Sequence, residues 1–376
     1  MCLRNLAFIF LVCCLVITSS LACTETMIKA KDNAVVVGRT LEFGPSLNSQ
    51  IISSPRGRQF KSIAPDNKPG ISWTAKYGYL YMNFFGQNYP VDGMNEKGLS
   101  FAALYAPGIT QYQIINPKQD NRALSYLSFG DWILGNFRTV AQVKQALAKV
   151  KVFAQPLSFP NHPNVVFPLH IMVTDRSGNS IVIEFIKGKM KIYNAKLGIM
   201  TNSPNYNWQI TNLSNYANLS PYSPKPVIID GYSYTANSQG SGMHGLPGDT
   251  TSPSRFVKTT FLTKSAFPVA NAMDAVVLVN HILNTVDIPN GMVRGEKGSG
   301  KSGVEITQWT VIKDLKNNTL YFRSYTNPQW QYIKMNKVNL TKGAPQFKMT
   351  LVSRPMMINA TQRFLRHVTI KNQDKG

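Results

Sequence analysis

Cysteine is scarce in this sequence and confined to its beginning. Four of the 376 residues are cysteines, and none follows Cys23; the other three are Cys2, Cys13 and Cys14. If a leader ends just before Cys23, this residue is the only cysteine of the remaining chain, and no disulfide can form within it. A lone cysteine in an exported protein is either a reactive thiol or an attachment point. Because chain termini are usually exposed, we expect Cys23 to lie at the surface rather than in the core.

Acidic residues are also few, which leaves the chain strongly basic. The sequence has 18 aspartates and glutamates against 40 lysines and arginines, a formal net charge of +22. Such a charge suits anionic partners, including carboxylate substrates, membrane surfaces and nucleic acid. The basic residues are scattered, with no arginine-rich run and no nucleic-acid-binding motif. We therefore predict a solvated basic surface and no nucleic-acid partner.

Metal-binding patterns are missing. The sequence has neither a C-x-x-C nor an H-E-x-x-H motif, and its histidines do not pair at metal-ligand spacing. We therefore predict no metal and no cofactor.

Residues 295–302, GEKGSGKS, fit the phosphate-loop pattern. That motif works only between a buried strand and a helix, whose N-terminal amides bind the phosphates. Here the strand-like segment VEITQWTVI follows it, and an exported protein meets little ATP. The segment is predicted to be a flexible basic loop, and no nucleotide is expected as a partner.

The first 22 residues have the pattern of a signal peptide. Arg4 supplies a positive charge, Leu6–Ile17 form an apolar run, and Ser20-Leu21-Ala22 is a small-x-small cleavage site. A membrane-spanning helix needs about 20 apolar residues, so this run is too short for a stable membrane anchor. We predict cleavage between Ala22 and Cys23 and export to the periplasm or the medium. Residues 23–376 then form a single domain, because no repeat, low-complexity segment or long linker divides them.

Strand patterns and helix patterns come in separate runs. Predicted strands cover 23–43 (a pair about Asp32-Asn33), 70–86, 97–107, 165–175, 180–194 and 304–326 (a pair about Asn317-Asn318). Predicted helices begin near Arg122 and cover 139–150 with Thr139 as N-cap, about 205–218, and 253–285 with a break near Pro268. Such runs indicate an α+β fold with layers of antiparallel strands rather than a parallel doubly wound sheet.

A cysteine at a chain terminus can be a nucleophile without a histidine. A thiol attacks an amide only as a thiolate, and the α-amino group of the same residue, with a pKa of about 7.7–8.0, can take its proton. Such a site also needs a carboxylate to orient the amine, a cation beside the thiolate and donors for the oxyanion. Arg39 and Glu42, in VGRTLEFG, are candidates. Being three residues apart, they point to opposite sides of a strand, so both approach Cys23 only where the strand ends or bulges.

Five segments carry a resemblance to a known family, in the right order. They are Cys23 with GRTLEFG (38–44), DGMNEKGLSFAALY (92–105), IMTNSPNYNWQITNL (199–213), GLPGDTTSPSRFVKTTF (245–261) and VEITQWTVIKDLKNNTLYF (304–322). With these segments the chain resembles the choloylglycine hydrolase family, which includes bile salt hydrolases and penicillin V acylases. This family belongs to the N-terminal nucleophile hydrolases.

The resemblance implies a fold, a reaction and a set of site residues. The fold is a four-layer αββα sandwich of two stacked antiparallel sheets, and members are often homotetramers. The reaction is cleavage of a linear amide C–N bond in a small-molecule acyl amide, through a thioester acyl-enzyme. The implied site consists of Cys23 as nucleophile with its α-amine as base, Arg39 beside the thiol, Glu42 at the usual aspartate position that holds the amine, Asn202 and the backbone N–H of Tyr105 as oxyanion donors, and Arg255 completing the charge network.

Several alternatives stay open at this point. Penicillin V acylases tend to have tyrosine at the position of Tyr105, which favours an acyl pocket of that kind; conjugated bile acids and N-acyl homoserine lactones are alternative substrates. A different interpretation is a binding protein anchored to a membrane by a lipid on Cys23, although Ser20 and Leu21 stand in the wrong order for that signal. A third is a basic surface-binding protein with an inactive site.

Overall fold

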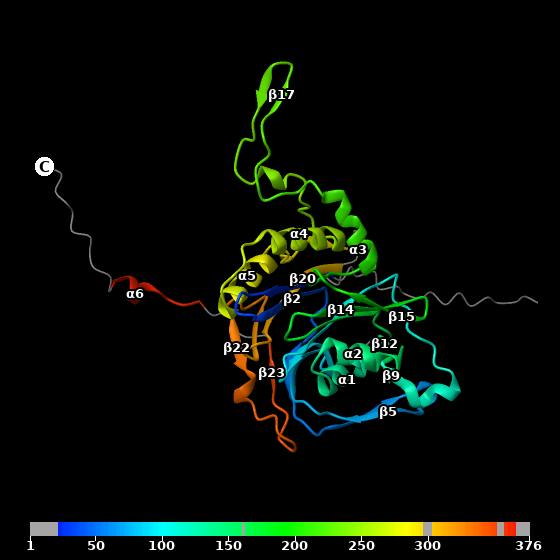
Figure 1. Cartoon of the computed structure of the whole chain (residues 1–376). Helices are drawn as coiled ribbons and strands as arrows, with labels where there is room; N and C mark the ends of the chain where they lie inside the picture. Colours follow the sequence, from blue (N-terminus) through cyan, green and yellow to red (C-terminus); the bar gives the residue numbers. More distant parts are fainter. Residues whose placement is uncertain (1–21, 160–161, 296–302, 352–356, 366–376) are drawn as a thin grey trace, which may run out of the picture.

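The structure, a computed structural model, describes residues 22–159, 162–295, 303–351 and 357–365 (Figure 1). The predicted signal peptide therefore lies outside the described residues, apart from Ala22. Most of the phosphate-loop motif also lies outside them.

Two antiparallel sheets form the centre of the molecule. The first sheet has the strand order β16 (Ile199–Met200), β1 (Cys23–Lys29), β2 (Val35–Phe43), β20 (Val304–Asp314), β21 (Thr319–Ser324) and β22 (Gln331–Lys334), with β19 (Val293–Arg294) paired to β20. The second sheet has the order β15 (Lys189–Asn194), β14 (Ser180–Ile186), β13 (Leu169–Thr174), β8 (Ser100–Tyr105), β7 (Gln87–Asn95), β6 (Tyr79–Phe84), β3 (Gln50–Ser54) and β23 (Lys348–Thr350).

Helices cover the outer faces of both sheets. In Figure 1, α4 (Ser252–Ser265) and α5 (Ala272–Asn284) lie over β2 and β20, and α1 (Phe129–Asn136) and α2 (Val140–Leu147) lie on the far side of the second sheet. The result is a four-layer αββα sandwich of two stacked antiparallel sheets, so the predicted α+β fold class is confirmed.

The remaining α-helices and strands of the described residues are short. They are α3 (Tyr206–Asn212), α6 (Thr361–Leu365) and four two-stranded pairs: β4 (Gln59–Ile63) with β5 (Pro69–Thr74), β9 (Ala123–Ser125) with β10 (Lys151–Phe153), β11 (Leu157–Phe159) with β12 (His162–Val165), and β17 (Val227–Ile229) with β18 (Tyr232–Tyr234).

Strand β2 explains how the layers stack, because all nine of its residues are buried. Successive side chains point to opposite faces of a strand. Val35 and Val37 therefore belong to the core between the two sheets, whereas Val36 packs with Val279 of α5 in a second core under the helices. A strand buried on both faces reads as a continuous apolar run, and this run is what the sequence has at 35–37.

Most of the predicted elements are confirmed, and one boundary is wrong. The strand pairs about Asp32-Asn33 and Asn317-Asn318 are β1–β2 and β20–β21, and the helix at 253–285 is broken near Pro268 into α4 and α5. Thr139 caps α2 by accepting a hydrogen bond from the backbone N–H of Gln142. The helix predicted to begin near Arg122 begins only at Phe129, because Ala123–Ser125 instead pair in parallel with β10.

A long arm leaves the sandwich at the helix side. Figure 1 shows β17 and β18 at the tip of a segment that extends away from α3 and α4. The apolar side chains of this tip, Val227, Ile228, Ile229, Tyr232 and Tyr234, are between 55% and 73% exposed. Among the described residues, no helix is long and apolar enough to cross a membrane.

The close approach of β2 to α5 depends on Gly38. A Cβ atom at this position would lie 2.2 Å from Val279 Cγ1 and 2.8 Å from Leu283 Cδ1. We expect Gly38→Ala to lower the free energy of unfolding by about 1–3 kcal/mol, because the helix must move off the sheet. Denaturant unfolding measures this change. Gly248→Ala is the matched control, since nothing lies within 4 Å of a Cβ there; equal stabilities for the two variants would contradict the packing argument.

Candidate active site

Cys23 is the first residue of β1 and lies inside the sandwich. Its backbone pairs with Leu41 of β2, and the residue is only 4% exposed. Ala22, which precedes it, is 3% exposed. The expectation that this residue lies at the surface is therefore wrong, because stacking of the second sheet covers the end of the strand.

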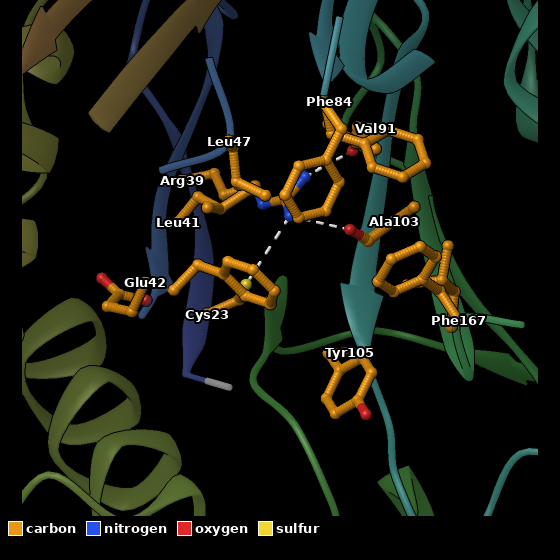
Figure 2. A pocket seen from close by; sticks show the side chains of 13 residues that line it. Cys23, Arg39, Leu41, Glu42, Leu47, Phe84, Val91, Ala103, Tyr105 and Phe167 are labelled. Atoms are coloured by element: carbon orange, nitrogen blue, oxygen red, sulfur yellow. Dashed lines mark hydrogen bonds between the residues drawn. The ribbon is translucent and has the colours of Figure 1, made fainter. Parts of the chain in front are cut away.

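Arg39 lies beside the thiol and between two strands of the second sheet. The β7–β8 ladder runs from Met94 to Asp92 on β7 and stops there, so Val91 and Ala103 would form the next pair. Arg39 fills that place: its guanidinium donates to the carbonyls of Val91 and Ala103, the latter at 2.7 Å. Its Nη2 is 3.6 Å from Cys23 Sγ (Figure 2). The predicted cation is thus in contact with the predicted nucleophile.

Glu42 lies on the other face of β2, toward the helices. Thr307 Oγ1 donates to its Oε1 at 3.0 Å, and burial raises the pKa of this carboxyl to about 8, against the lowering effect of Arg255. The register of β2 against β20 shifts between Leu41 and Glu42, so the strand has the irregularity predicted from the sequence. The backbone nitrogen of Cys23 donates to Asn202 rather than to Glu42, so the role of Glu42 as holder of the amine stays a prediction.

The hydrogen-bond partners of Asn202 fix which side of its amide carries the oxygen and which the nitrogen. Its Oδ1 accepts from the Cys23 backbone N–H at 2.7 Å and from Arg255 Nη2 at 2.7 Å, and its Nδ2 donates to the carbonyl of Tyr105 at 2.7 Å. A guanidinium and a peptide N–H only donate, and a carbonyl only accepts, so the amide cannot be reversed. One Nδ2 hydrogen remains to point at a bound substrate.

Helix α4 holds this arrangement from the other side. Arg255, one turn into α4, also donates to the carbonyl of Cys23 and to Thr24 Oγ1, the latter at 2.6 Å. Ser252, the first residue of α4, accepts from the backbone N–H of Asn202 at 2.9 Å. All six predicted site residues therefore meet around Cys23, although they come from β1, β2, β8, α4 and the segment after β16.

An apolar pocket opens on the thiol. Figure 2 shows Cys23 and Arg39 at one side of it and aromatic side chains at the other. The cavity holds about 50 Å³ and is lined by Cys23, Arg39, Leu41, Glu42, Phe43, Leu47, Phe84, Phe85, Val91, Ala103, Tyr105, Phe167 and Leu169. Phe84 and Phe167 pack edge to face, with ring centroids 5.3 Å apart. The pocket suits an apolar group attached to the atom that Cys23 attacks.

The electrostatic environment of the thiol combines two opposed effects. Burial raises the pKa of Cys23 above its ordinary value, and the neighbouring guanidinium of Arg39 acts against that rise. A thiolate in this place needs the cation, since a buried anion without a partner is costly.

Sequence reasoning missed several buried ionisable residues around the site. His170 and Glu184 support the segment that carries Asn202: His170 Nε2 donates to the carbonyl of Thr201 at 2.8 Å, and Glu184 accepts from the backbone N–H of Tyr206 at 2.8 Å. Asp92 pairs with Arg39 and with Lys313 behind the thiol. The only signal in the sequence was an ionisable residue inside an otherwise apolar strand.

The phosphate-loop motif falls almost wholly outside the described residues, but its flanks are described. Val293–Arg294 and Val304–Asp314 on either side are antiparallel strands that pair with each other, so the long described element after the motif is a strand, as the sequence predicts. Within the described ranges, no group of three or more His, Cys, Asp or Glu side chains is placed to hold a metal ion.

The chain is similar in sequence to proteins of one known family. The family model for linear amide C–N hydrolases of the choloylglycine hydrolase family matches residues 23–350. The chain is 36% identical over 324 residues to a bile salt hydrolase/transferase from Clostridium perfringens, covering 85% of this chain and 94% of that protein. It is 24% identical over 352 residues to a penicillin V acylase from Pectobacterium atrosepticum, covering 88% of this chain and 86% of that protein.

Solved structures show the same architecture. A variant of the conjugated bile acid hydrolase from Clostridium perfringens superposes with a TM-score of 0.77 at 32% identity, covering 90% of this chain and 99% of that one. A penicillin V acylase from Agrobacterium tumefaciens, at 24% identity and a TM-score of 0.71, shares the fold.

The contacts of Asn202 lead to a prediction. Asn202→Ala removes the oriented amide, and we expect the rate constant of amide hydrolysis to fall about 10²–10³-fold, as for the loss of one oxyanion donor. Steady-state kinetics measures the effect. Asn207→Ala, an exposed position on α3 of the same segment, is the control and should keep its rate. Equal rates for both variants would remove Asn202 from the chemistry.

Proposed function

This chain belongs to the choloylglycine hydrolase family and is a linear amide C–N hydrolase, and we propose that Cys23 is its nucleophile. The observation that carries the proposal is the position of the thiol, on the wall of an apolar pocket and 3.6 Å from Arg39. A thioester acyl-enzyme on Cys23 is then the intermediate of the reaction.

The proposed first half of the reaction forms the acyl-enzyme. Once the bond to Ala22 is cut, the nitrogen of Cys23 is a free α-amine and takes the proton of the thiol. The sulfur attacks the amide carbon of the substrate, and negative charge develops on the amide oxygen. The free Nδ2 hydrogen of Asn202 and the backbone N–H of Tyr105 stabilise that oxygen. The α-ammonium then gives its proton to the leaving amine, and the C–N bond breaks.

The second half releases the acid. A water molecule gives a proton to the α-amine and attacks the thioester carbon, and the carboxylic acid leaves while the thiol is restored. Arg255 keeps Asn202 Oδ1 and the Cys23 carbonyl in place during both halves. Arg39 compensates the charge of the thiolate, and Glu42 is proposed to hold the ammonium from the helix side.

The pocket favours a substrate with an apolar acyl group. Its lining is almost entirely aliphatic and aromatic, and its volume of about 50 Å³ is small beside the roughly 300–1,000 Å³ of sites that enclose a whole small molecule. We propose that the acyl end enters while the amine part stays outside. The identity of 36% with a bile salt hydrolase/transferase favours conjugated bile acids, and Tyr105 favours penicillin V; N-acyl homoserine lactones are a third option.

Burial of Cys23 also bears on the alternative of a lipid anchor. A lipid on the sulfur would need the thiol at the surface, but the residue is 4% exposed and its side chain faces the second sheet. We therefore favour an exported enzyme with a free terminal cysteine, in the periplasm or the medium, over an anchored binding protein.

We expect the exported protein to begin at an unmodified Cys23 and to hydrolyse at least one of the three substrate classes. Intact-mass measurement with N-terminal sequencing checks the terminus, and a panel of penicillin V, glycine and taurine conjugates of bile acids and acyl homoserine lactones checks the activity. Cys23→Ser should lower the turnover rate at least roughly 100-fold, because a hydroxyl is a far weaker nucleophile here. A lipid adduct on Cys23, or a Ser variant as active as the parent, would sink the proposal.

We further propose that the exposed arm binds a second copy of the chain. The tip, from Val227 to Tyr234, projects apolar side chains away from the sandwich, and contiguous exposed apolar surface usually marks an interaction site. A homotetramer, as is common in the family, would cover it.

Light scattering with size-exclusion chromatography tests this assembly. We expect the parent protein to elute as a tetramer and the double variant Ile228→Lys with Tyr232→Lys to elute as a smaller species, since two charges would have to be buried. Phe267→Lys, at a residue 90% exposed between α4 and α5, is the control and should stay tetrameric. A monomeric parent protein would refute the assembly while leaving the enzymatic proposal intact.

A further inference from the structure

Four buried ionisable side chains lie between the two sheets on the same side as the thiol. They are Glu25, Arg39, Asp92 and Lys313, here called the inter-sheet charge cluster, and none is more than 1% exposed. Asp92 accepts from Lys313 Nζ at 2.8 Å and lies 3.3 Å from Arg39 Nη1. Neither carboxylate oxygen of Glu25 has a hydrogen-bond partner among the residues that the structure describes. The cluster thus contains one carboxyl group that its surroundings do not satisfy.

Strand register places Glu25 close to the groups that act on Cys23. Glu25 is two residues along β1 from Cys23, so both side chains leave the same face of the sheet. Directly across, Glu25 pairs with Arg39 of β2, and Val37, two residues along β2, pairs with Lys313 of β20. A charge on Glu25 therefore acts on the same guanidinium that contacts the thiol.

The charges of the cluster decide what Glu25 does. Ionised Arg39, Lys313 and Asp92 sum to one positive charge, so a single additional negative charge makes the buried region neutral. Either the Glu25 carboxylate or the Cys23 thiolate can supply it. Both together leave an uncompensated buried anion, which is costly in a medium of low dielectric constant. The ionisation of each group therefore disfavours ionisation of the other.

We propose that Glu25 is a positioning residue whose charge sets how readily Cys23 loses its proton: ionised Glu25 keeps Cys23 as a thiol, and protonated Glu25 favours the thiolate. The protons concerned exchange with solvent, and no other group is consumed. This inference rests on the proposed role of Cys23 as the nucleophile. It adds a residue that touches neither the substrate nor the sulfur.

Among the described residues, the charged groups that act on Glu25 are Lys313, Asp92 and Arg39. Arg39 faces it from β2, Lys313 from β20 and Asp92 from β7, while the β16 and β8 segments carry no charged residue. On the helix side, Glu42 and Arg255 act on Cys23. Burial raises the pKa of Glu25 to about 7, so its charge changes close to neutral pH. Below that pH the cluster is positive and favours the thiolate; above it, the carboxylate opposes the thiolate.

The experiment measures the rate of alkylation of Cys23 by iodoacetamide against pH in the purified full chain, read by mass spectrometry of the Cys23 peptide. For Glu25→Gln we expect the midpoint pH of this titration to fall by roughly 0.5–1 unit, because one nearby negative charge is lost. Lys313→Met removes a positive charge and should raise the midpoint by a similar amount. The double variant, in which both charges are gone, should return close to the parent value.

Asp131→Asn is the matched control. Burial raises the pKa of Asp131 to about 7 as well, but this residue is on α1, where Tyr79 donates to it, on the outer side of the second sheet. The midpoint pH of Cys23 alkylation in Asp131→Asn should equal that of the parent protein. An unchanged midpoint in Glu25→Gln, or shifts of the same sign in Glu25→Gln and Lys313→Met, would overturn the inference. If one of the two variants does not fold, the sign of the shift in the other decides.

Alkylation separates this inference from the proposed function, because it needs no turnover. Opposite shifts in a protein without amidase activity would sustain the link between Glu25 and Cys23 and refute the nucleophile role. An active protein whose activity depends on Cys23, but whose midpoint ignores Glu25, would refute only the present inference.

Discussion

The guanidinium of Arg39 is the interaction on which the site depends. It sits where the ladder between β7 and β8 ends, and it satisfies the carbonyls of Val91 and Ala103 that would otherwise be buried without partners. It also pairs with Asp92 and reaches the thiol of Cys23. Because unsatisfied buried carbonyls are costly, the side chain is fixed from several directions at once. Arg39, a residue of the first sheet, thus binds the second sheet where the β7–β8 ladder ends and places its positive charge beside the sulfur of Cys23 (Figure 2).

The end of β1 is where two chemically different surroundings meet. Between the sheets, the Cys23 side chain faces Arg39 and the apolar pocket. Toward the helices, its backbone carbonyl and nitrogen meet Arg255 and Asn202. A residue in the middle of a strand would have both backbone groups in the ladder, so only a residue at the strand end can present its nitrogen to Asn202. The site therefore needs groups from both sheets and from α4, which is why its residues are widely separated in sequence.

The sequence predicted features that depend on neighbouring residues, such as turns. It did not predict features that depend on how the two sheets stack. The hairpins about Asp32-Asn33 and Asn317-Asn318 have local turn signals, and Arg39 with Glu42 required an irregular strand that the structure contains. Burial of Cys23 could not be predicted, because it comes from a second sheet formed by distant segments. Lys313 read as an ordinary member of an alternating strand, since its partner Asp92 belongs to the other sheet. The helix predicted to begin near Arg122 is absent from Ala123–Ser125, which pair in parallel with β10 instead. The periodicity of apolar residues does not reveal such a pairing.

The bond between Ala22 and Cys23 has a further consequence, for the order of events in the life of the protein. In the folded chain the carbonyl of Ala22 accepts from the backbone N–H of Glu42 at 2.8 Å, and Ala22 is 3% exposed. A protease binds its substrate as an extended, accessible segment. It could therefore cut the bond between Ala22 and Cys23 only before the two sheets close. The predicted cleavage between Ala22 and Cys23 would then precede folding. Folding itself would carry the new terminus into the site.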